Sequence, residues 1–474
     1  MTSTVELPVW FLLIIIALAV WVVLERLLVP GVRWFFRRRV NRVIEELNQR
    51  LRLRLPTFSL TKRKVLVDRL TYDPKVLAAI GEYCDSTGTP WEVALNRVEG
   101  YAREIIPAFN AYMYFRFGRW IARRIVQRLY RIRIAYSSHY DLERFDPKAS
   151  IVFVINHRSN MDYVLVAYLA QKHTALSFAV GEWARVWPVT PLIKALGGYF
   201  VRRNSGDPLY RRVLERYVQM AVAGGVVQAV FPEGGLSRDG RFREPRIGLL
   251  DYMLRNFDPD GERDILFVPV AVNYDRVVED RTLLREAQGR RAERKSTLYA
   301  IWASLAFIGR SARRRFRGEW YRMGYAAAGF GEPISAREWC RKQGSDFRRL
   351  SRQKRSRYTL EFAAHLMARI GDNMPALPVP LVCWILLTEP TRGWSRQGLE
   401  AAYADAVERL RRREPPGVIP RRDPTYAVDV GLRMLRLRKL IISGERVYRV
   451  DPEHREILDY YANAIRHLLE PGRR

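Results

Sequence analysis

Between residues 148 and 335, short apolar runs alternate with segments of helical periodicity, and this alternation constrains the fold more than any other feature of the chain. Runs of this length separated by helices are typical of strands in βαβ units, where a helix joins each pair of parallel strands. We therefore predict an α/β domain over residues 148–335, with a largely parallel sheet flanked by helices. The predicted strands are Ile151–Ile155, Leu176–Val180, Gly198–Val201, Val226–Phe231, Ile265–Val272 and Tyr325–Phe330.

Helical patterns dominate on either side of this domain. Residues 31–147 form a predicted basic helical N-terminal region, and residues 336–474 a predicted helical C-terminal domain. Aromatic side chains interleave with arginine over Ile105–Ile134, which suits a helix lying on lipid and equally an amphipathic helix with a solvated basic face. Stacking on nucleic acid would use the same residue types, but no nucleic-acid-binding motif accompanies them, and we expect no nucleic-acid partner.

Near the N-terminus, Leu7–Leu24 is an uninterrupted run without charge, about as long as a helix that spans the hydrocarbon core. Trp10 and Trp21 lie near its ends, and arginines follow it, which places the remaining chain in the cytoplasm by the positive-inside rule. Residues 1–30 are thus a predicted transmembrane anchor in the cell (inner) membrane. The alternative, a cleaved signal peptide, would need a basic first segment and a small-residue cleavage site.

The chain carries 81 Lys and Arg against 50 Asp and Glu, a formal net charge of +31. This excess favours an anionic partner, such as membrane lipid or an acidic substrate or carrier, although a biased arginine-rich composition would also produce it. The three cysteines, Cys84, Cys340 and Cys383, have neither the spacing of a metal site nor that of a disulfide framework.

The first candidate site is His157 with Asp162, directly after the predicted strand Ile151–Ile155. In open α/β sheets, ligands bind at the carboxyl ends of strands. The two side chains meet only if His157 lies in the loop and Asp162 in the first turn of the next helix, since five residues of continuous helix would point them apart. A neutral imidazole oriented by a carboxylate acts as a general base. Ser159 and Asp162 also match a helix-capping box, a purely structural role.

Two further segments follow predicted strands. Gly197–Arg203 ends in paired arginines, whose guanidinium groups bind phosphate oxygens in a bidentate manner. Phe231–Gly240 contains the adjacent Gly234 and Gly235 just after the strand, which allow backbone N–H groups to approach an anion, or which simply form a turn. A fourth segment, Phe267–Val270, places Pro269 inside a strand, where proline marks an edge or a bulge that shapes a pocket.

The order and spacing of these four segments resemble those of the glycerol-3-phosphate acyltransferases, within the wider glycerolipid acyltransferase superfamily. His157–Tyr163 and Ser237–Arg241 are similar to the glycerol-3-phosphate branch, as is the tail from Tyr448 to Asn463. Asn156, Phe231-Pro232 and Leu236 depart from that branch, the first two toward the lysophosphatidate acyltransferases. The N-terminal span is also unusual for the bacterial members.

The resemblance implies an enzyme in which His157 is the general base and Asp162 orients it. The sn-1 hydroxyl of glycerol 3-phosphate would attack the thioester of acyl-CoA or acyl-carrier protein to give lysophosphatidate for phospholipid biosynthesis, with neither a cofactor nor a metal. The alternatives are an acyltransferase with lysophosphatidate as acceptor, and a basic membrane-binding protein without activity. The implied substrate-binding residues are Arg202, Arg203, Glu233, Gly234, Ser237, Arg238 and Pro269.

Overall fold

The computed structural model describes residues 8–10, 15–16, 18–19, 56–136, 146, 148–170, 174–181, 185, 189–202, 205–289, 323–413, 423–444 and 447–470. The chain divides into two units, Met1–Arg54 and Leu55–Arg474. Most of the predicted span Leu7–Leu24 lies outside the described residues. Within the part that is described, no helix has the length and apolarity needed to cross a membrane. The anchor therefore stays a prediction.

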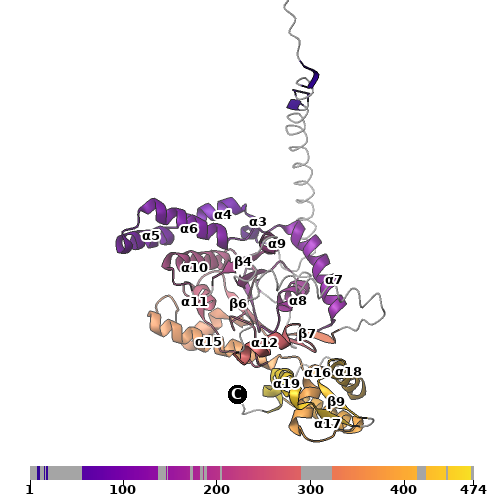
Figure 1. Cartoon of the computed structure of the whole chain (residues 1–474). Helices are drawn as coiled ribbons and strands as arrows, with labels where there is room; N and C mark the ends of the chain where they lie inside the picture. Colours follow the sequence, from indigo (N-terminus) through magenta and orange to yellow (C-terminus); the bar gives the residue numbers. More distant parts are fainter. Residues whose placement is uncertain are drawn as a thin grey trace, which may run out of the picture. The chain divides into compact units, whose positions relative to one another are not determined.

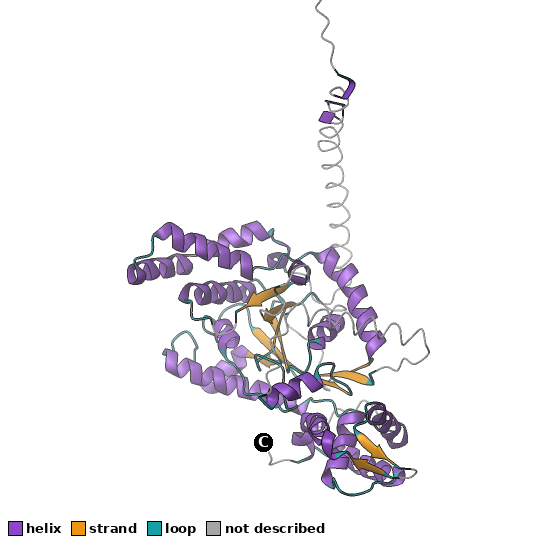
Figure 2. Cartoon of the chain, in the orientation of Figure 1, coloured by secondary structure: helices purple, strands orange, loops and turns teal. Residues whose placement is uncertain are grey.

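A sheet of eight described strands is the centre of this unit (Figures 1 and 2). The neighbouring strands follow the order β1-β7-β6-β2-β5-β3-β4, and β8 pairs with β6 outside that path. Their bounds are Arg131–Tyr136 (β1), Ser150–Ile155 (β2), Ser177–Gly181 (β3), Gly198–Val201 (β4), Gln228–Val230 (β5), Ile265–Tyr274 (β6), Tyr325–Phe330 (β7) and Ile334–Ser335 (β8).

All six predicted strands are present, and the sheet is largely parallel as predicted. Only the pairings of β6 with β7 and with β8 are antiparallel. Strand β2 lies between β5 and β6, parallel to both, and each of its six residues is buried. This explains why it reads as a continuous apolar run, since a strand covered on both faces needs no polar alternation.

Pro269 occupies a gap in the ladder of β6. On one edge, β6 pairs with β8 through Leu266 and Phe267, and with β7 from Val270 onward. Pro269 lies between these two segments, where the strand needs no amide donor, and its carbonyl accepts a hydrogen bond from the Gly331 N–H. The proline thus marks the change of partner strand.

Helices of the α/β domain connect these strands and pack on them (Figure 1). Helix α9 packs against β4, and α10 packs against α11. The bounds are Met161–Ala170 (α8), Val189–Ala195 (α9), Pro208–Ala223 (α10), Gly248–Leu254 (α11) and Asp280–Ala287 (α12).

Of the predicted N-terminal helical region, the residues described from 56 onward are mainly helical up to Leu129, and the chain then enters the sheet, which corrects the predicted extent. Residues 131–136 form β1, parallel to β7, instead of continuing the helix predicted over Ile105–Ile134. A π-helical segment precedes the last helix. The elements are α3 (Thr57–Leu60), α4 (Arg63–Thr71), α5 (Pro74–Thr87), α6 (Trp91–Ile105), η2 (Met113–Gly118) and α7 (Arg119–Leu129).

The C-terminal region is helical as predicted, with one small antiparallel hairpin that the pattern does not reveal. Its first two helices, α14 and α15, pack on β6, whereas α16 packs on α18 and α19. The helices are α14 (Ala336–Gln343), α15 (Arg352–Asp372), α16 (Pro378–Thr388), α17 (Arg396–Arg411), α18 (Pro424–Leu437) and α19 (Arg455–Leu469), with the turn η5 (Pro452–His454). The hairpin strands are β9 (Ile441–Ser443) and β10 (Tyr448–Val450).

Candidate active site

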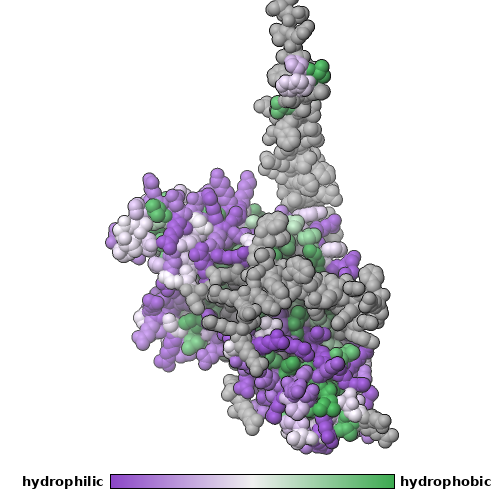
Figure 3. All heavy atoms as spheres, in the orientation of Figure 1, coloured by the Kyte–Doolittle hydropathy of each residue, from purple (hydrophilic) through white to green (hydrophobic). Residues whose placement is uncertain are grey.

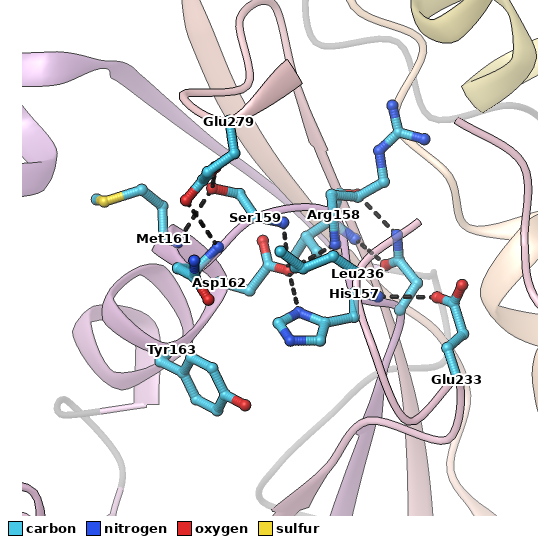
Figure 4. A network of polar contacts seen from close by, with 12 residues as sticks. His157, Arg158, Ser159, Met161, Asp162, Tyr163, Glu233, Leu236 and Glu279 are labelled. Carbon is cyan, nitrogen blue, oxygen red and sulfur yellow. Dashed lines mark hydrogen bonds and ion pairs between the residues drawn. The ribbon is translucent and has the colours of Figure 1, made fainter. Parts of the chain in front are cut away.

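His157 and Asp162 form a hydrogen-bonded pair at the carboxyl end of β2, as the sequence predicts (Figure 4). His157 lies in the loop after β2, and Asp162 is the second residue of α8. The imidazole Nδ1 is 2.9 Å from the Asp162 Oδ2, and the two residues are only 3% and 0% exposed. With Nδ1 held by the carboxylate, the opposite ring nitrogen, Nε2, has no hydrogen-bond partner within the described part of the chain. It is therefore available to a substrate.

The capping interpretation of the same loop is also correct. The Asp162 Oδ2 accepts hydrogen bonds from the backbone N–H groups of Arg158, at 2.7 Å, and Ser159, at 3.0 Å. The Met161 N–H in turn donates to the Ser159 Oγ at 3.1 Å. One carboxylate thus starts helix α8 and orients the imidazole, so the two interpretations describe a single arrangement.

The Glu-Gly segment after β5 holds the backbone of His157 on both sides. The Glu233 carboxylate accepts the His157 N–H at 2.8 Å and the Arg243 N–H at 2.9 Å. The Ser237 N–H donates to the His157 carbonyl oxygen at 2.9 Å. Burial raises the pKa of Glu233 to about 7, against the opposing effect of those two backbone hydrogen bonds. In this structure Glu233 and Ser237 therefore position the histidine loop.

Two residues that the sequence did not single out complete this network. The Tyr274 hydroxyl, at the end of β6, donates to the Asp162 Oδ1 at 2.6 Å. The Glu279 carboxylate, before α12, accepts the Ser159 hydroxyl at 2.7 Å and the Asn160 N–H at 3.3 Å. Burial, together with the nearby Asp162, raises the pKa of Glu279. The position of Tyr274 at a strand's carboxyl end was the only signal that could have indicated it.

A cavity of about 400 Å³ opens at His157. The imidazole packs against two aromatic rings, those of Phe231 at 4.4 Å and Tyr163 at 5.4 Å between ring centroids. Mainly apolar residues of β3, α10 and α11 line the rest of the cavity. Three arginines, Arg202, Arg211 and Arg246, also line it. The cavity therefore combines one oriented imidazole with a cationic side.

The structure brings one of the three predicted phosphate-binding arginines into this cavity. Arg202 lines it, while its guanidinium makes two hydrogen bonds with the Glu104 carboxylate, at 2.9 and 2.5 Å. Arg203 lies outside the described residues. Arg238 is not among the cavity-lining residues; its side chain is 54% exposed, and its Nε is 3.6 Å from the Glu286 carboxylate.

Gly234 does lie on the cavity wall, and its position explains why the sequence has glycine there. Its φ is +63°, and a Cβ at this position would come within 2.6 Å of the Arg246 Cδ. Gly234 therefore leaves room for the Arg246 side chain along the wall, and the Arg246 N–H is hydrogen-bonded to the Pro232 carbonyl oxygen at 2.7 Å. Arg246 is a cavity-lining arginine that the sequence pattern did not reveal. Pro269, inside β6, does not line the cavity.

A second cavity, of about 210 Å³, shares Tyr163 and Val180 with the first. Its lining is almost entirely apolar and comes mainly from η2, α7, α8, α9 and β3. An apolar volume therefore lies next to the volume that contains the imidazole. Within the described part of the chain, no group of three or more His, Cys, Asp or Glu side chains is arranged to hold a metal ion. The metal-free and cofactor-free reaction stays a prediction.

Comparisons with known proteins identify two regions of the chain. The family model described as Acyltransferase matches residues 137–273, and the one described as Glycerol-3-phosphate acyltransferase C-terminal region matches residues 313–471. A protein of Pseudomonas aeruginosa (strain LESB58) named glycerol-3-phosphate acyltransferase is 29% identical over 91% of this chain and 51% of its own length. One of Aeromonas hydrophila with the same name is 27% identical over 86% of this chain and 50% of its own.

The chain therefore spans about half the length of the curated relatives it matches. A solved structure, the 1-acyl-sn-glycerophosphate acyltransferase of Thermotoga maritima, matches at 16% identity with a TM-score of 0.32, over 65% of this chain and 97% of that one. The family matches confirm the resemblance: the chain carries an acyltransferase domain followed by a glycerol-3-phosphate acyltransferase C-terminal region.

Proposed function

We propose that this protein is a glycerol-3-phosphate 1-O-acyltransferase. It transfers a fatty acyl group from acyl-CoA or acyl-carrier protein to the sn-1 hydroxyl of glycerol 3-phosphate, and the product is lysophosphatidate. The observation that carries this proposal is the buried His157–Asp162 pair, whose imidazole lines a cavity with a cationic side. The relatives named glycerol-3-phosphate acyltransferase support the choice of acceptor.

In the proposed reaction, Nε2 of His157 accepts the proton of the sn-1 hydroxyl as its oxygen attacks the thioester carbonyl carbon. The C–O bond forms, the C–S bond of the tetrahedral intermediate breaks, and the leaving thiolate takes the proton back from the imidazolium. Asp162 holds the tautomer with the proton on Nδ1 and stabilises the positive ring. Because the carboxylate is held by four described hydrogen-bond donors, it needs no rearrangement during the reaction.

The acceptor phosphate is proposed to bind on the arginine side of the cavity. A dianionic phosphate suits planar guanidinium groups, which bind two oxygens at once. Arg202 is already paired with Glu104, whereas the Arg246 side chain is exposed along the wall of the same cavity as His157. Arg246 is therefore the first residue to test. The roles of Arg203 and Arg238 as phosphate ligands stay predictions.

The apolar cavity is proposed to take the acyl chain. Tyr163 and Val180 belong to both linings, so a thioester placed at His157 has its hydrocarbon end next to the apolar volume. Sites for lipophilic ligands are lined mainly by apolar and aromatic side chains with few polar groups, which describes this lining.

We further propose that the protein works at the cytoplasmic face of the cell (inner) membrane and contacts anionic lipid. Leu7–Leu24 supplies the predicted anchor. Viewed from one side, the described surface is mainly hydrophilic, with hydrophobic side chains among the polar ones (Figure 3). On η2 and α7, Phe117 is 42% exposed and Trp120 is 53% exposed, and the Arg124 guanidinium lies 5.0 Å from the Trp120 ring. Aromatic and basic side chains together suit a lipid interface.

The test is an acyl-transfer assay in which glycerol 3-phosphate and lysophosphatidate are offered in parallel with a labelled acyl thioester. The proposal predicts labelled lysophosphatidate from glycerol 3-phosphate at a much higher rate than phosphatidate from lysophosphatidate. The reverse preference would favour the lysophosphatidate acyltransferase alternative. No transfer to either acceptor from acyl-CoA or acyl-carrier protein would favour the non-catalytic membrane-binding alternative.

A further inference from the structure

Helix α19, in the C-terminal region, carries two adjacent tyrosines, Tyr460 and Tyr461, that are both fully buried. The two rings are nearly perpendicular, with an interplanar angle of 86°, and they contact different neighbours: Tyr461 contacts Asp280, and Tyr460 contacts Arg158. Helix α19 lies beside α12 (Figure 1). We propose that α19 is a positioning element for the reaction. It contacts two segments, the turn before α12 and residues 237–240, and both of these are hydrogen-bonded to the loop that carries His157 and Asp162. The inference rests on the proposed function.

Tyr461 holds the first of these segments, the turn that leads into α12. Its hydroxyl donates to the Asp280 Oδ2 at 2.6 Å and accepts the Val277 N–H at 3.0 Å. The Arg438 guanidinium completes the cluster, 3.0 Å from the Tyr461 hydroxyl and 2.6 Å from the Asp280 carboxylate. Loss of the Tyr461 hydroxyl would leave the buried Val277 N–H without its acceptor and remove one hydrogen bond from the Asp280 carboxylate, which would keep only Arg438 across this cluster.

Glu279 connects this turn to the catalytic loop. It directly precedes Asp280, and its carboxylate accepts the hydroxyl of Ser159 and the N–H of Asn160. Ser159 in turn donates its own N–H to the Asp162 carboxylate. A displacement of the turn at Asp280 therefore moves Glu279, which accepts hydrogen bonds from the loop between His157 and Asp162. The distance between His157 and Asp162 depends on the position of that loop.

The other side of α19 holds the second segment, residues 237–240. The Tyr460 ring lies 4.9 Å from the Arg158 guanidinium, which also donates to the Gly240 carbonyl oxygen. The Asn463 side chain donates to the Asp239 carbonyl oxygen at 2.9 Å. This contact requires glycine at position 240, because its φ is +86° and a Cβ would come within 1.9 Å of the Tyr460 carbonyl oxygen.

The 237–240 segment reaches the catalytic histidine in two steps. The Gly240 N–H donates to the Ser237 hydroxyl at 3.1 Å, and the Ser237 N–H donates to the His157 carbonyl oxygen. Arg158, next to His157 in the chain, is 2% exposed, and its Nε and Nη2 have no partner within the described residues. The Tyr460 ring is thus a main neighbour of the buried Arg158 guanidinium, and Arg158 is next to His157 in the chain.

The two tyrosines provide a matched pair of variants. Tyr461→Phe removes a hydroxyl with three partners, whereas Tyr460→Phe removes one that has no partner among the described residues and keeps the ring. For Tyr461→Phe, we expect kcat per folded molecule to fall about tenfold, the equivalent of one hydrogen bond to a charged group. KM for both substrates should remain unchanged. For Tyr460→Phe, both constants should match the wild type.

A purely structural role for α19 would change the fraction of folded protein but not kcat per folded molecule, so circular dichroism and thermal unfolding accompany the kinetics. If folded Tyr461→Phe has the same kcat as folded Tyr460→Phe, the inference is overturned, and the acyl transfer by the wild type is unaffected. Absence of transfer in the wild type would instead overturn the proposed function. If Tyr461→Phe does not fold, Asn463→Ala decides, since that side chain is only partly buried. A lower kcat at constant KM supports the inference, and wild-type kinetics contradict it.

Discussion

Asp162→Asn tests how much of the reaction depends on the charge of one buried carboxylate. The Asp162 Oδ2 accepts three hydrogen bonds, from the His157 ring and two backbone N–H groups, and Oδ1 accepts the Tyr274 hydroxyl. An asparagine has the same shape. Its carbonyl oxygen can replace Oδ2, and its amide can donate to the Tyr274 oxygen, so every group keeps a partner and the variant should fold.

The negative charge is what this substitution removes. Loss of one partner of a buried ion pair costs about 3–5 kcal/mol, and the imidazolium forms next to Asp162 only during the reaction. At 1.4 kcal/mol per decade, kcat should fall by about 10²–10⁴-fold. Tyr274→Phe removes a single hydrogen bond to the same carboxylate and keeps its charge. That loss is worth about 1.5–3 kcal/mol, or about 10–100-fold, so the tyrosine variant should be the more active of the two.

The assay is steady-state transfer at saturating glycerol 3-phosphate and acyl thioester, with circular dichroism and thermal unfolding as controls for folding. A folded Asp162→Asn protein with wild-type kcat would refute the role of the carboxylate. An Asp162→Asn protein more active than Tyr274→Phe would refute the ranking, and with it the argument that charge outweighs a single hydrogen bond.

Three further outcomes are expected. Because burial raises the pKa of Glu233 to about 7, this group's stabilising contribution is present at low pH and is lost as the pH rises through about 7. In urea unfolding, the free energy of unfolding of the wild type should therefore fall relative to that of Glu233→Gln between pH 5 and pH 8. A difference between the two proteins that stays constant with pH would contradict the shift. Arg246→Gln should raise KM for glycerol 3-phosphate about tenfold at an unchanged thioester KM, the loss of one charge-assisted hydrogen bond. An effect seen with Arg238→Gln and not with Arg246→Gln would place the phosphate at Arg238 instead. A reporter fused after residue 474 should be active in the cytoplasm, and activity only outside the inner membrane would reverse the proposed orientation.

The geometry at the centre of the site was largely predictable because this part is local in sequence. A buried strand, a loop histidine and a carboxylate in the next helical turn fall within Ser150–Asp162, and the predicted pairing of His157 with Asp162 is confirmed at 2.9 Å. The predicted bounds Gly198–Val201 and Tyr325–Phe330 also agree with the structure, because a short apolar run between helices leaves little choice of where the strand begins and ends.

The parts that were not predicted depend on contacts between distant positions. Tyr274 is 112 residues from Asp162, and Glu279 is 120 residues from Ser159, so no local pattern connects them. The pairing of Arg202 with Glu104 likewise joins positions far apart in the sequence. It occupies guanidinium N–H groups that the sequence analysis assigned to a phosphate. Strand β1 was missed for a different reason: it is an edge strand whose Arg131 and Arg133 are exposed, which resembles the end of a basic helix.

The central claim is that His157 is the general base of an acyl transfer to glycerol 3-phosphate. The most direct test compares wild type and His157→Ala in the same transfer assay, at equal concentrations of folded protein. Loss of a general base lowers the rate by about 10²–10⁴-fold, so we expect labelled lysophosphatidate from the wild type and about one part in a hundred or less from the variant, with the fold unchanged. Comparable turnover by folded His157→Ala protein would contradict the claim.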